Sequence, residues 1–448
     1  MLSIKSVERK TWRNWSGTSR FKPEKMLYPS SIDDVVYIVK EARKQNKRIR
    51  VVGAGHSFTE LVQTDDWLIS LDLLSGIESL NEEEKTVTVF AGTRLKQLGE
   101  ELGEKGYAQE NLGDINVQSV AGAISTGTHG TGITFGNISS QVVALTIVTG
   151  RGEVLTISEE ENAEYFKASL VSLGTLGIIV KVKLKVIETP VYEYRSDKVN
   201  FVKLEEKLEQ YIEENRHFEI FMFPYSDLVQ IKTMNITDRK PQRLFFHRLK
   251  NLILENYVFQ LLSSISRTFP KSSRMISRLS AWGISKAVIS AKSYDLFATP
   301  RLVRFTEIEY CIPIERFKKA LREVRKQINE KKYNVHFPIE CRTVKADDIW
   351  LSPSYNRDSA YIAFHMYKGM PYDDYFKDME TIMKKYDGRP HWGKMHHLND
   401  GELKEKYPKW QSFLDVRKKL DPDGIFLNDY LKELLLESES TQIEMEVK

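Results

Sequence analysis

Helical and strand-like spacings of apolar residues alternate in the first part of the chain. Ser31 precedes a stretch with helical spacing, and its side chain is suited to cap the first turn. A β-branched run that begins at Ile49 then predicts a strand, and further short apolar runs follow it. We expect strands at 49–52, 67–71, 86–91, 141–148 and 178–184, and a helix at 94–105. This α/β rhythm predicts a first domain over residues 20–190.

Longer runs of alternating apolar and polar residues characterise the next part of the chain. Residues 218–223 and 305–311 predict strands, and residues 314–329 predict an amphipathic helix. Together they predict an α+β domain with a mixed or antiparallel sheet over residues 191–380.

Residues 240–292 form a basic segment that is rich in apolar residues at helical spacing, and we expect it to be helical. The simpler interpretation is a set of helices that pack on the second domain. A membrane-facing surface is the alternative, because Lys and Arg beside an apolar helical face suit an anionic leaflet. The chain ends in a charged segment, and we expect a mobile tail at 433–448.

Composition limits the possible classes of protein. The chain has 448 residues, of which 41% are hydrophobic, and this length favours two domains. Its 66 Lys and Arg nearly balance 62 Asp and Glu, so no nucleic-acid partner is expected. The cysteines, Cys311 and Cys341, lack the spacing of a metal site, so we expect free thiols and no metal. A polar N-terminus and the absence of a long charge-free run predict a cytoplasmic protein, possible membrane contact aside.

A glycine turn follows the predicted strand at 49–52. It runs Val52-Gly53-Ala54-Gly55-His56-Ser57, and such a turn lets main-chain N–H groups approach a phosphate while His56 offers a nucleophilic nitrogen. A tight turn with an incidental histidine is the alternative.

Two further glycine-rich clusters occupy residues 118–132 and 172–179. The first has Ser, Thr and small residues, which would let the backbone lie close to a long flat ligand, although a flexible connection is also possible. The cluster at 172–179 carries a glycine pair into a strand, and a simple turn with glycine at the end of a helix is the alternative interpretation. Neither cluster matches a Rossmann or P-loop fingerprint.

These clusters resemble motifs of the vanillyl-alcohol-oxidase-type (PCMH-type) flavoproteins, and within them the sugar-1,4-lactone oxidase and alditol oxidase group. Two later motifs are specific to that group: Glu-x-Arg at Glu340 and Arg342, and His-Trp-x-Lys from His391 to Lys394. The resemblance covers residues 20–432 and implies an α+β, two-domain PCMH-type FAD-binding fold with an α+β cap (substrate) domain. Residues 20–190 would bind FAD, residues 191–380 would form the cap, and residues 381–432 would return to the first domain.

The resemblance also implies a flavin site, with FAD attached covalently through His56. The implied cofactor-binding residues are Val52, Gly53, Ala54, Gly55, His56, Ser57, Ser119, Ile124, Gly127, Thr128, His129, Gly130, Ile179 and His391.

The implied catalytic residues are Lys394, Arg342 and Glu340, and the implied substrate-binding residues are these three with Ser119, His365 and Tyr367. Glu340 and Arg342 would share one face of a strand and grip a polyol, although a surface ion pair has the same spacing. A cation at Lys394 would favour a developing alkoxide. The substrate proton would pass either to Lys394, if burial lowers its pKa, or to water.

The resulting hypothesis is an FAD enzyme that oxidises a CH–OH group of an aldono-1,4-lactone of the arabinono- or gulonolactone type. Hydride would pass to flavin N5, with oxygen as the acceptor and hydrogen peroxide as the product. Alternatives are an alditol (xylitol or sorbitol) oxidase and a lactone dehydrogenase that uses a quinone or a cytochrome. A non-catalytic membrane-surface binding protein that uses residues 240–292 is the alternative from another class.

Overall fold

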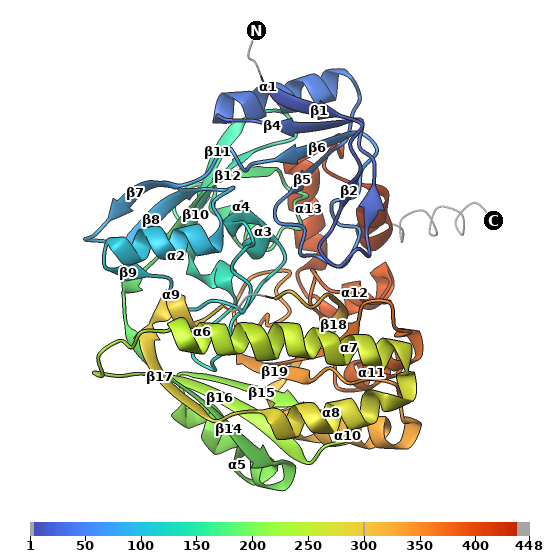
Figure 1. Cartoon of the computed structure of the whole chain (residues 1–448). Helices are drawn as coiled ribbons and strands as arrows, with labels where there is room; N and C mark the ends of the chain where they lie inside the picture. Colours follow the sequence, from blue (N-terminus) through green and yellow to red (C-terminus); the bar gives the residue numbers. More distant parts are fainter. Residues whose placement is uncertain (1–3, 299–300, 437–448) are drawn as a thin grey trace, which may run out of the picture.

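The structure is a computed structural model that describes residues 4–298 and 301–436. Two groups of sheets lie one above the other (Figure 1). The upper group comes from residues 5–188, and the lower group is an eight-stranded sheet from residues 191–390.

The upper group has two principal sheets. In the four-stranded sheet, of order β1-β4-β6-β5, strands β4 and β5 are parallel to β6. The five-stranded sheet, of order β11-β10-β12-β8-β7, is antiparallel. The strands of these sheets and of two short pairs are β1 (Lys5–Glu8), β2 (Trp12–Arg13), β3 (Arg20–Phe21), β4 (Lys25–Tyr28), β5 (Ile49–Val52), β6 (Trp67–Ser70), β7 (Ile77–Asn81), β8 (Thr86–Phe90), β9 (Tyr107–Ala108), β10 (Val142–Val148), β11 (Val154–Ser158), β12 (Ile178–Lys185) and β13 (Ile187–Glu188).

The lower sheet is antiparallel and has the order β17-β14-β16-β15-β19-β20-β18-β21. Its strands are β14 (Val191–Asn200), β15 (His217–Met222), β16 (Leu228–Ile236), β17 (Ala287–Lys292), β18 (Phe305–Pro313), β19 (Ile339–Val344), β20 (Ser359–Tyr367) and β21 (Arg389–Pro390).

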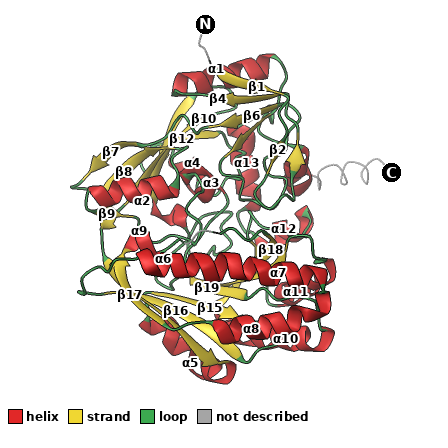
Figure 2. Ribbon diagram, viewed as in Figure 1, coloured by secondary structure: helices red, strands yellow, loops and turns green. Residues whose placement is uncertain are grey.

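Helices cover both groups of sheets (Figure 2). They are α1 (Ile32–Lys44), α2 (Leu95–Glu104), α3 (Val120–Ser125), η1 (Ile138–Gln141), α4 (Ala163–Ser169), α5 (Phe201–Glu214), α6 (Phe245–Asn251), the π-helical η2 (Leu252–Val258), α7 (Phe259–Thr268), η3 (Pro270–Ser272), α8 (Ser273–Gly283), α9 (Ser293–Leu296), η4 (Ile314–Arg316), α10 (Phe317–Lys331), α11 (Asp373–Lys385), α12 (Asp400–Lys406) and α13 (Trp410–Leu420). Within the described residues, every helix is too short or too polar to cross a bilayer.

Helix α1 forms where its cap and its apolar spacing predict it. Ser31 Oγ accepts the N–H of Asp34, and the Asp34 carboxylate accepts the N–H of Ser31, at 3.1 Å in each case. Val35, Val39 and Ala42 then face the core. The predicted strands of the first domain and the helix at 94–105 are likewise confirmed as β5, β6, β8, β10, β12 and α2.

The C-terminal part of the chain returns to the upper group, where α13 lies near β5 in Figure 1. The N–H of Ile49 donates to the carbonyl of Ile425 at 2.7 Å, and the Asn428 amide donates to the carbonyl of Gln63 at 2.9 Å. The return therefore holds the start of β5, the strand that leads into the His56 turn, and the loop at Gln63 that follows this turn.

Two predictions about this part of the fold are wrong. Residues 240–292 are not helical throughout, because residues 287–292 form β17 and pair with β14 at the sheet edge. The mobile tail was placed too early, since residues 433–436 continue a helix in which Leu434 and Leu435 are buried. The rest of that predicted tail, residues 437–448, lies outside the described residues.

Candidate active site

The His56 turn leaves β5 with its main-chain donors free. Gly55 has a left-handed φ of +68°, which glycine adopts without strain. Within the described residues, the N–H groups of Ala54, Gly55, His56 and Ser57 have no hydrogen-bond acceptor. Four successive free N–H groups favour an anionic ligand.

The ring of His56 is held by a neighbouring aromatic side chain and stays neutral. Its ring stacks on Trp15 at a centroid distance of 5.3 Å. Burial, aided by the positive charges of Lys394 and Arg94, lowers the pKa of His56 to about 4. The imidazole is therefore neutral at neutral pH and keeps a nucleophilic lone pair.

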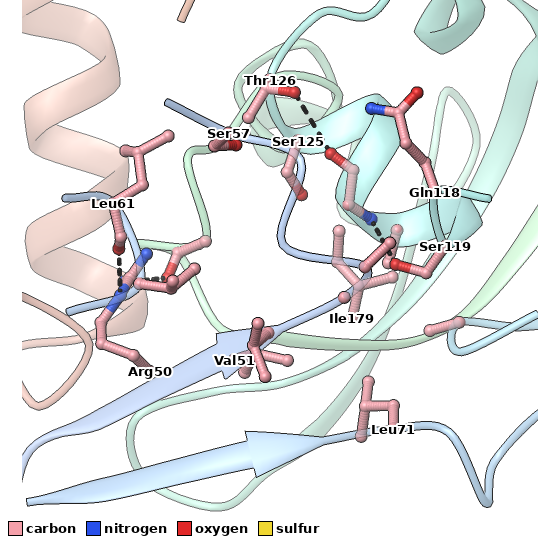
Figure 3. Close-up of a pocket in the computed structure, with 18 of the residues that line it drawn as sticks. Arg50, Val51, Ser57, Leu61, Leu71, Gln118, Ser119, Ser125, Thr126 and Ile179 are labelled. Atoms are coloured by element: carbon pink, nitrogen blue, oxygen red, sulfur yellow. Dashed lines mark hydrogen bonds between the residues drawn. The ribbon is translucent and has the colours of Figure 1, made fainter. Parts of the chain in front are cut away.

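A narrow cleft runs from this turn along the two other glycine-rich clusters. Figure 3 shows Arg50 at one end of the cleft and Gln118 with Ser119 at the other, with Val51 and Ile179 between them. A Cβ on Gly53 would lie 2.5 Å from Ser119 Oγ, so a larger residue there would displace the hydroxyl that caps helix α3. Free N–H groups, hydroxyls and glycines along a narrow cleft fit the pyrophosphate and flat ring of FAD.

A second, larger cavity of about 530 Å³ adjoins the cleft. His56, Ser57, Gln118 and Thr126 line both, so a group bound at His56 would face the larger cavity. Its volume is in the range of small-molecule sites.

One face of the eight-stranded sheet supplies the polar side of this cavity. Strand β20 lies between β18 and β19, and Ala363 is paired with Glu309 on one side and Glu340 on the other. Glu307 is paired with His365 in a neighbouring row. Because residues two apart on a strand share a face, these side chains and Arg342 face the same space.

Lys394 reaches the cavity from a tight turn. The Lys394 N–H donates to the carbonyl of His391 at 2.9 Å, and the Phe58 N–H donates to the carbonyl of Gly393 at 2.8 Å. The second bond joins this turn to the His56 loop. The Lys394 ammonium lies 2.5 Å from Glu307 Oε2 and 4.0 Å from Glu309 Oε2.

The charge state of Lys394 decides one alternative that the sequence leaves open. Burial by itself would lower the pKa of Lys394, but Glu307 and Glu309 outweigh burial and raise it. Burial alone would also raise the pKa of Glu307, yet Lys394 and His365 lower it to about 2. Lys394 is therefore a protonated ammonium, which favours water, of the two alternatives, as the acceptor of the substrate proton.

Arg342 lies in a second network of buried charges. It pairs with Glu340, and its guanidinium lies 2.7 Å from Asp114 Oδ1 and 3.4 Å from Glu219 Oε2. Asp114 also binds Arg301 at 2.6 Å. Burial would raise the pKa of Asp114, but the two guanidinium groups lower it to about 2. The Glu-x-Arg motif is thus buried beside the cavity and is no surface ion pair.

The acidic and histidine groups of the two networks are also close enough to hold a cation. The ligand atoms of His129, Glu309 and His391 lie within 4.8 Å of one another, as do those of Asp114, Glu219 and Glu340. Lys394 and Arg342 already supply positive charge at these places.

Most of the predicted site residues gather around the two spaces, in two sets. The cleft is lined by Val52, Gly53, Ala54, Gly55, His56, Ser57, Ser119 and Ile179. The larger cavity is lined by His56, Ser57, Thr128, His129, Glu340, Arg342, His365, His391 and Lys394.

Some predicted residues lie elsewhere. Tyr367 does not line the cavity, because its hydroxyl lies 3.2 Å from Ser264 of α7 and its ring lies under Arg267. Ser119 lines only the cleft, where its hydroxyl caps α3, so the prediction that it binds substrate finds no support.

Three predicted cofactor-binding residues line neither space. Ile124 is fully buried on the inner side of α3. Gly127 has a φ of +68° in the turn after that helix, and Gly130 lies against Asn111. These residues shape the loop and do not face its ligand space.

The sequence reasoning missed several charged residues of the cavity. They are Asp114, Lys232, Arg301, Glu307 and Glu309, and Glu219 pairs with Lys232 and Arg342 behind this lining. The strand spacing of Glu307 and Glu309 equals that of Glu340 and Arg342, and this signal could have identified them.

Comparison with known proteins agrees with this geometry. Residues 182–434 match the D-arabinono-1,4-lactone oxidase family, and residues 23–158 match the FAD binding domain. The chain is 38% identical to L-gulono-1,4-lactone dehydrogenase of Mycobacterium tuberculosis (strain ATCC 25618 / H37Rv), over 95% of this chain and 99% of that protein. It is 34% identical to L-gulonolactone oxidase of Mus musculus, over 94% and 98%.

Among solved structures, cholesterol oxidase from B. sterolicum superposes with a TM-score of 0.83 at 17% identity, over 96% of this chain and 97% of that one. This likeness concerns the fold alone. It confirms the predicted α+β FAD-binding fold with two domains.

Proposed function

The chain belongs to the D-arabinono-1,4-lactone oxidase family, and on that basis we propose that it oxidises a CH–OH group of an aldono-1,4-lactone of the arabinono- or gulonolactone type. It is an FAD-linked oxidoreductase of the sugar-lactone group. The observation that carries the proposal is the larger cavity, where Lys394 and the Glu-x-Arg motif lie around the opening at His56. Family membership also sets aside the non-catalytic binding protein.

Bound FAD would supply flavin N5 as the hydride acceptor. The free N–H groups of the His56 turn, which line the cleft, would hold the cofactor there. We propose that the neutral His56 ring carries the covalent link to the cofactor. Ser57, which lines both spaces, would lie where the cleft meets the substrate.

In the cavity, Lys394 donates a hydrogen bond to the hydroxyl that is oxidised, and its charge favours the developing alkoxide. Since Lys394 keeps its proton, water in the cavity takes the hydroxyl proton. Glu340 accepts hydrogen bonds from the other hydroxyls of the lactone, and Arg342 donates hydrogen bonds to them. Asp114 and Glu219 hold the Arg342 guanidinium in place for this contact.

For the second half of the reaction we propose oxygen as the acceptor, with hydrogen peroxide as the product. A quinone or a cytochrome as the electron acceptor is kept as the alternative, because one relative is named as a dehydrogenase. Small residues from Val120 to Ala123 would control access of oxygen. Alditol oxidation stays the alternative for the substrate, and cytoplasmic residence stays a prediction.

The test is a panel of aldono-1,4-lactones and alditols given to the purified yellow protein without oxygen. Bleaching of the flavin absorbance by a lactone, but not by xylitol or sorbitol, supports the proposal, and bleaching by none of them contradicts it. Air is then admitted, and peroxide is measured against product. Peroxide in equal amount supports oxygen as the acceptor, whereas reoxidation only by an artificial acceptor shows a dehydrogenase.

A further inference from the structure

Helices α6 to α8 carry their large apolar side chains on the outside. Of the twenty-one large apolar residues that are exposed in the described part of the chain, thirteen lie between Phe245 and Trp282. Phe246 is 81% exposed, Leu261 63% and Trp282 72%. A contiguous exposed apolar face of this kind marks an interaction surface.

The buried positions of the same helices are mostly small and polar. Ser263, Ser266, Ser273 and Ser277 are fully buried, and Asn256 is nearly so. Such a distribution is the reverse of the one in a helix that packs on a core and faces water. The simpler interpretation of residues 240–292 is packing against the second domain. It does not account for the large apolar side chains that are exposed on these helices.

These serines fasten the helices to the body of the protein. Ser263 Oγ lies 2.8 Å from His336 Nε2, and the hydroxyl of Ser277 donates to the carbonyl of Pro224 at 2.6 Å. Ser266 and Ser273 join α7 to α8 at 2.6 Å. The apolar face is thus held outward by hydrogen bonds on the opposite side.

The face lies in a strongly basic segment. Residues 240–286 contain nine Lys and Arg and one acidic residue, Glu255. Within the described residues, the exposed Arg243, Lys250 and Lys271 have no carboxylate partner. Positive charge beside an exposed apolar helical face is complementary to an anionic lipid surface, which supplies both phosphate and hydrocarbon.

The same face surrounds the mouth of the larger cavity. Leu254, Val258, Leu279 and Trp282 line the cavity and are also exposed on the surface. Figure 1 shows α6 and α7 as one continuous rod where the two groups of sheets meet, with α8 below it. A surface that docks here would cover that mouth.

We propose that the outward face of α6, η2, α7 and α8 docks on an anionic bilayer and places the mouth of the cavity at the lipid interface. Phe246, Leu261 and Phe269 enter the interface, and Arg243, Lys250 and Lys271 bind lipid phosphate. The helices lie in the plane of the bilayer and do not cross it. The proposal goes beyond lactone oxidation and does not rest on it.

The test is sedimentation of the holoprotein with vesicles. We expect at least about tenfold more protein bound to vesicles of phosphatidylglycerol and phosphatidylcholine than to phosphatidylcholine alone, because an anionic surface attracts the basic segment. Added salt lowers the bound fraction. Equal binding to both kinds of vesicle, or to neither, overturns the proposal.

Two variants separate the apolar face from charge alone. Phe246→Glu with Leu261→Glu, at exposed positions, should abolish sedimentation, whereas Val202→Glu, at a 60% exposed position on α5, should not. Unchanged flavin content and circular dichroism show that each variant folds. Binding by the double variant at the wild-type level overturns the proposal.

A third readout places the mouth of the cavity. Brominated acyl chains should quench the tryptophan fluorescence of the wild type, and Trp282→Phe should remove most of that quenching. Quenching that persists in Trp282→Phe contradicts the orientation.

A second copy of the chain is the other occupant that these measurements can reveal. If the wild type forms a stable dimer and does not bind vesicles, and Phe246→Glu with Leu261→Glu dissociates that dimer, the proposal is overturned and a second copy is the partner.

Discussion

Lys394→Met removes the buried ammonium and keeps a side chain of similar length. In the native protein that ammonium lies 2.5 Å from Glu307 and 4.0 Å from Glu309, and its side chain is 17% exposed. The substitution therefore leaves two buried carboxylates without their shared cation. We expect separate effects on the reaction and on stability.

The geometry sets the size of both effects. At an effective dielectric constant of about 20, Coulomb's law gives an attraction of about 7 kcal/mol at the shorter distance and about 4 kcal/mol at the longer one. Desolvation offsets most of this, and breaking a buried pair costs about 3–5 kcal/mol of the free energy of unfolding. Loss of a charge directed at a developing oxyanion lowers kcat by about 10²–10³.

A second substitution separates the two effects. Lys394→Met with Glu307→Gln removes one of the uncompensated carboxylates, so most of the free energy of unfolding should return. The rate of flavin bleaching should not recover, because the positive charge at the substrate is still missing.

The rate is measured by stopped-flow bleaching of the flavin without oxygen, and stability by urea unfolding followed by circular dichroism. Lys167→Met is the matched control, since Lys167 also pairs with two carboxylates, Asp348 at 2.9 Å and Glu159 at 3.1 Å, and both of these are exposed. It should cost at most about 1 kcal/mol and leave the rate unchanged. A Lys394→Met rate within threefold of the wild type would refute the assigned role.

Three further predictions concern other parts of the site. His56→Ala should keep FAD bound but release it on acid precipitation, and a wild type that also releases all its flavin refutes the covalent link. Asp114→Asn should raise KM about tenfold with unchanged flavin content, because Arg342 and Arg301 lose their shared carboxylate; a change in kcat alone would contradict this. Because Lys394 and His365 outweigh burial and lower the pKa of Glu307 from 4.5 to about 2, its stabilisation is present above pH 4.5 and is lost as pH falls toward 2. Glu307→Gln should make the free energy of unfolding fall by about 3 kcal/mol less over this acid range, as measured by urea titrations at several pH values.

Local signals in the sequence predicted much of the fold. The Ser31 cap and the apolar spacing behind it define α1, because both act within a few turns of helix. Glycine at 53 and 55 predicted the turn that carries His56, since only small side chains fit there.

Features that depend on register could not be predicted in the same way. Glu307 and Glu309 alternate with apolar residues, which is also the pattern of a strand with one face in water. They become site residues because β20 lies between β18 and β19 and pairs Ala363 with both Glu309 and Glu340. No short stretch of sequence contains that arrangement.

Charge composition does not show where the charges lie, for a related physical reason. The near balance of 66 basic and 62 acidic residues suggests an evenly mixed surface, yet the structure separates the charges by place. Carboxylates such as Glu307 and Glu309 are buried in the cavity, while Lys250 of α6 and Lys271 of η3 are exposed. The buried carboxylates and the exposed apolar face of α6 to α8 both reverse the usual rule that charge faces water and apolar groups face the core. Buried charges and exposed apolar side chains cost stability unless a ligand or a partner compensates them. A region that has both is therefore expected to be a functional site. A substrate that binds the inner charges and a surface that covers the outer apolar face would compensate both reversals, one on each side of the same opening.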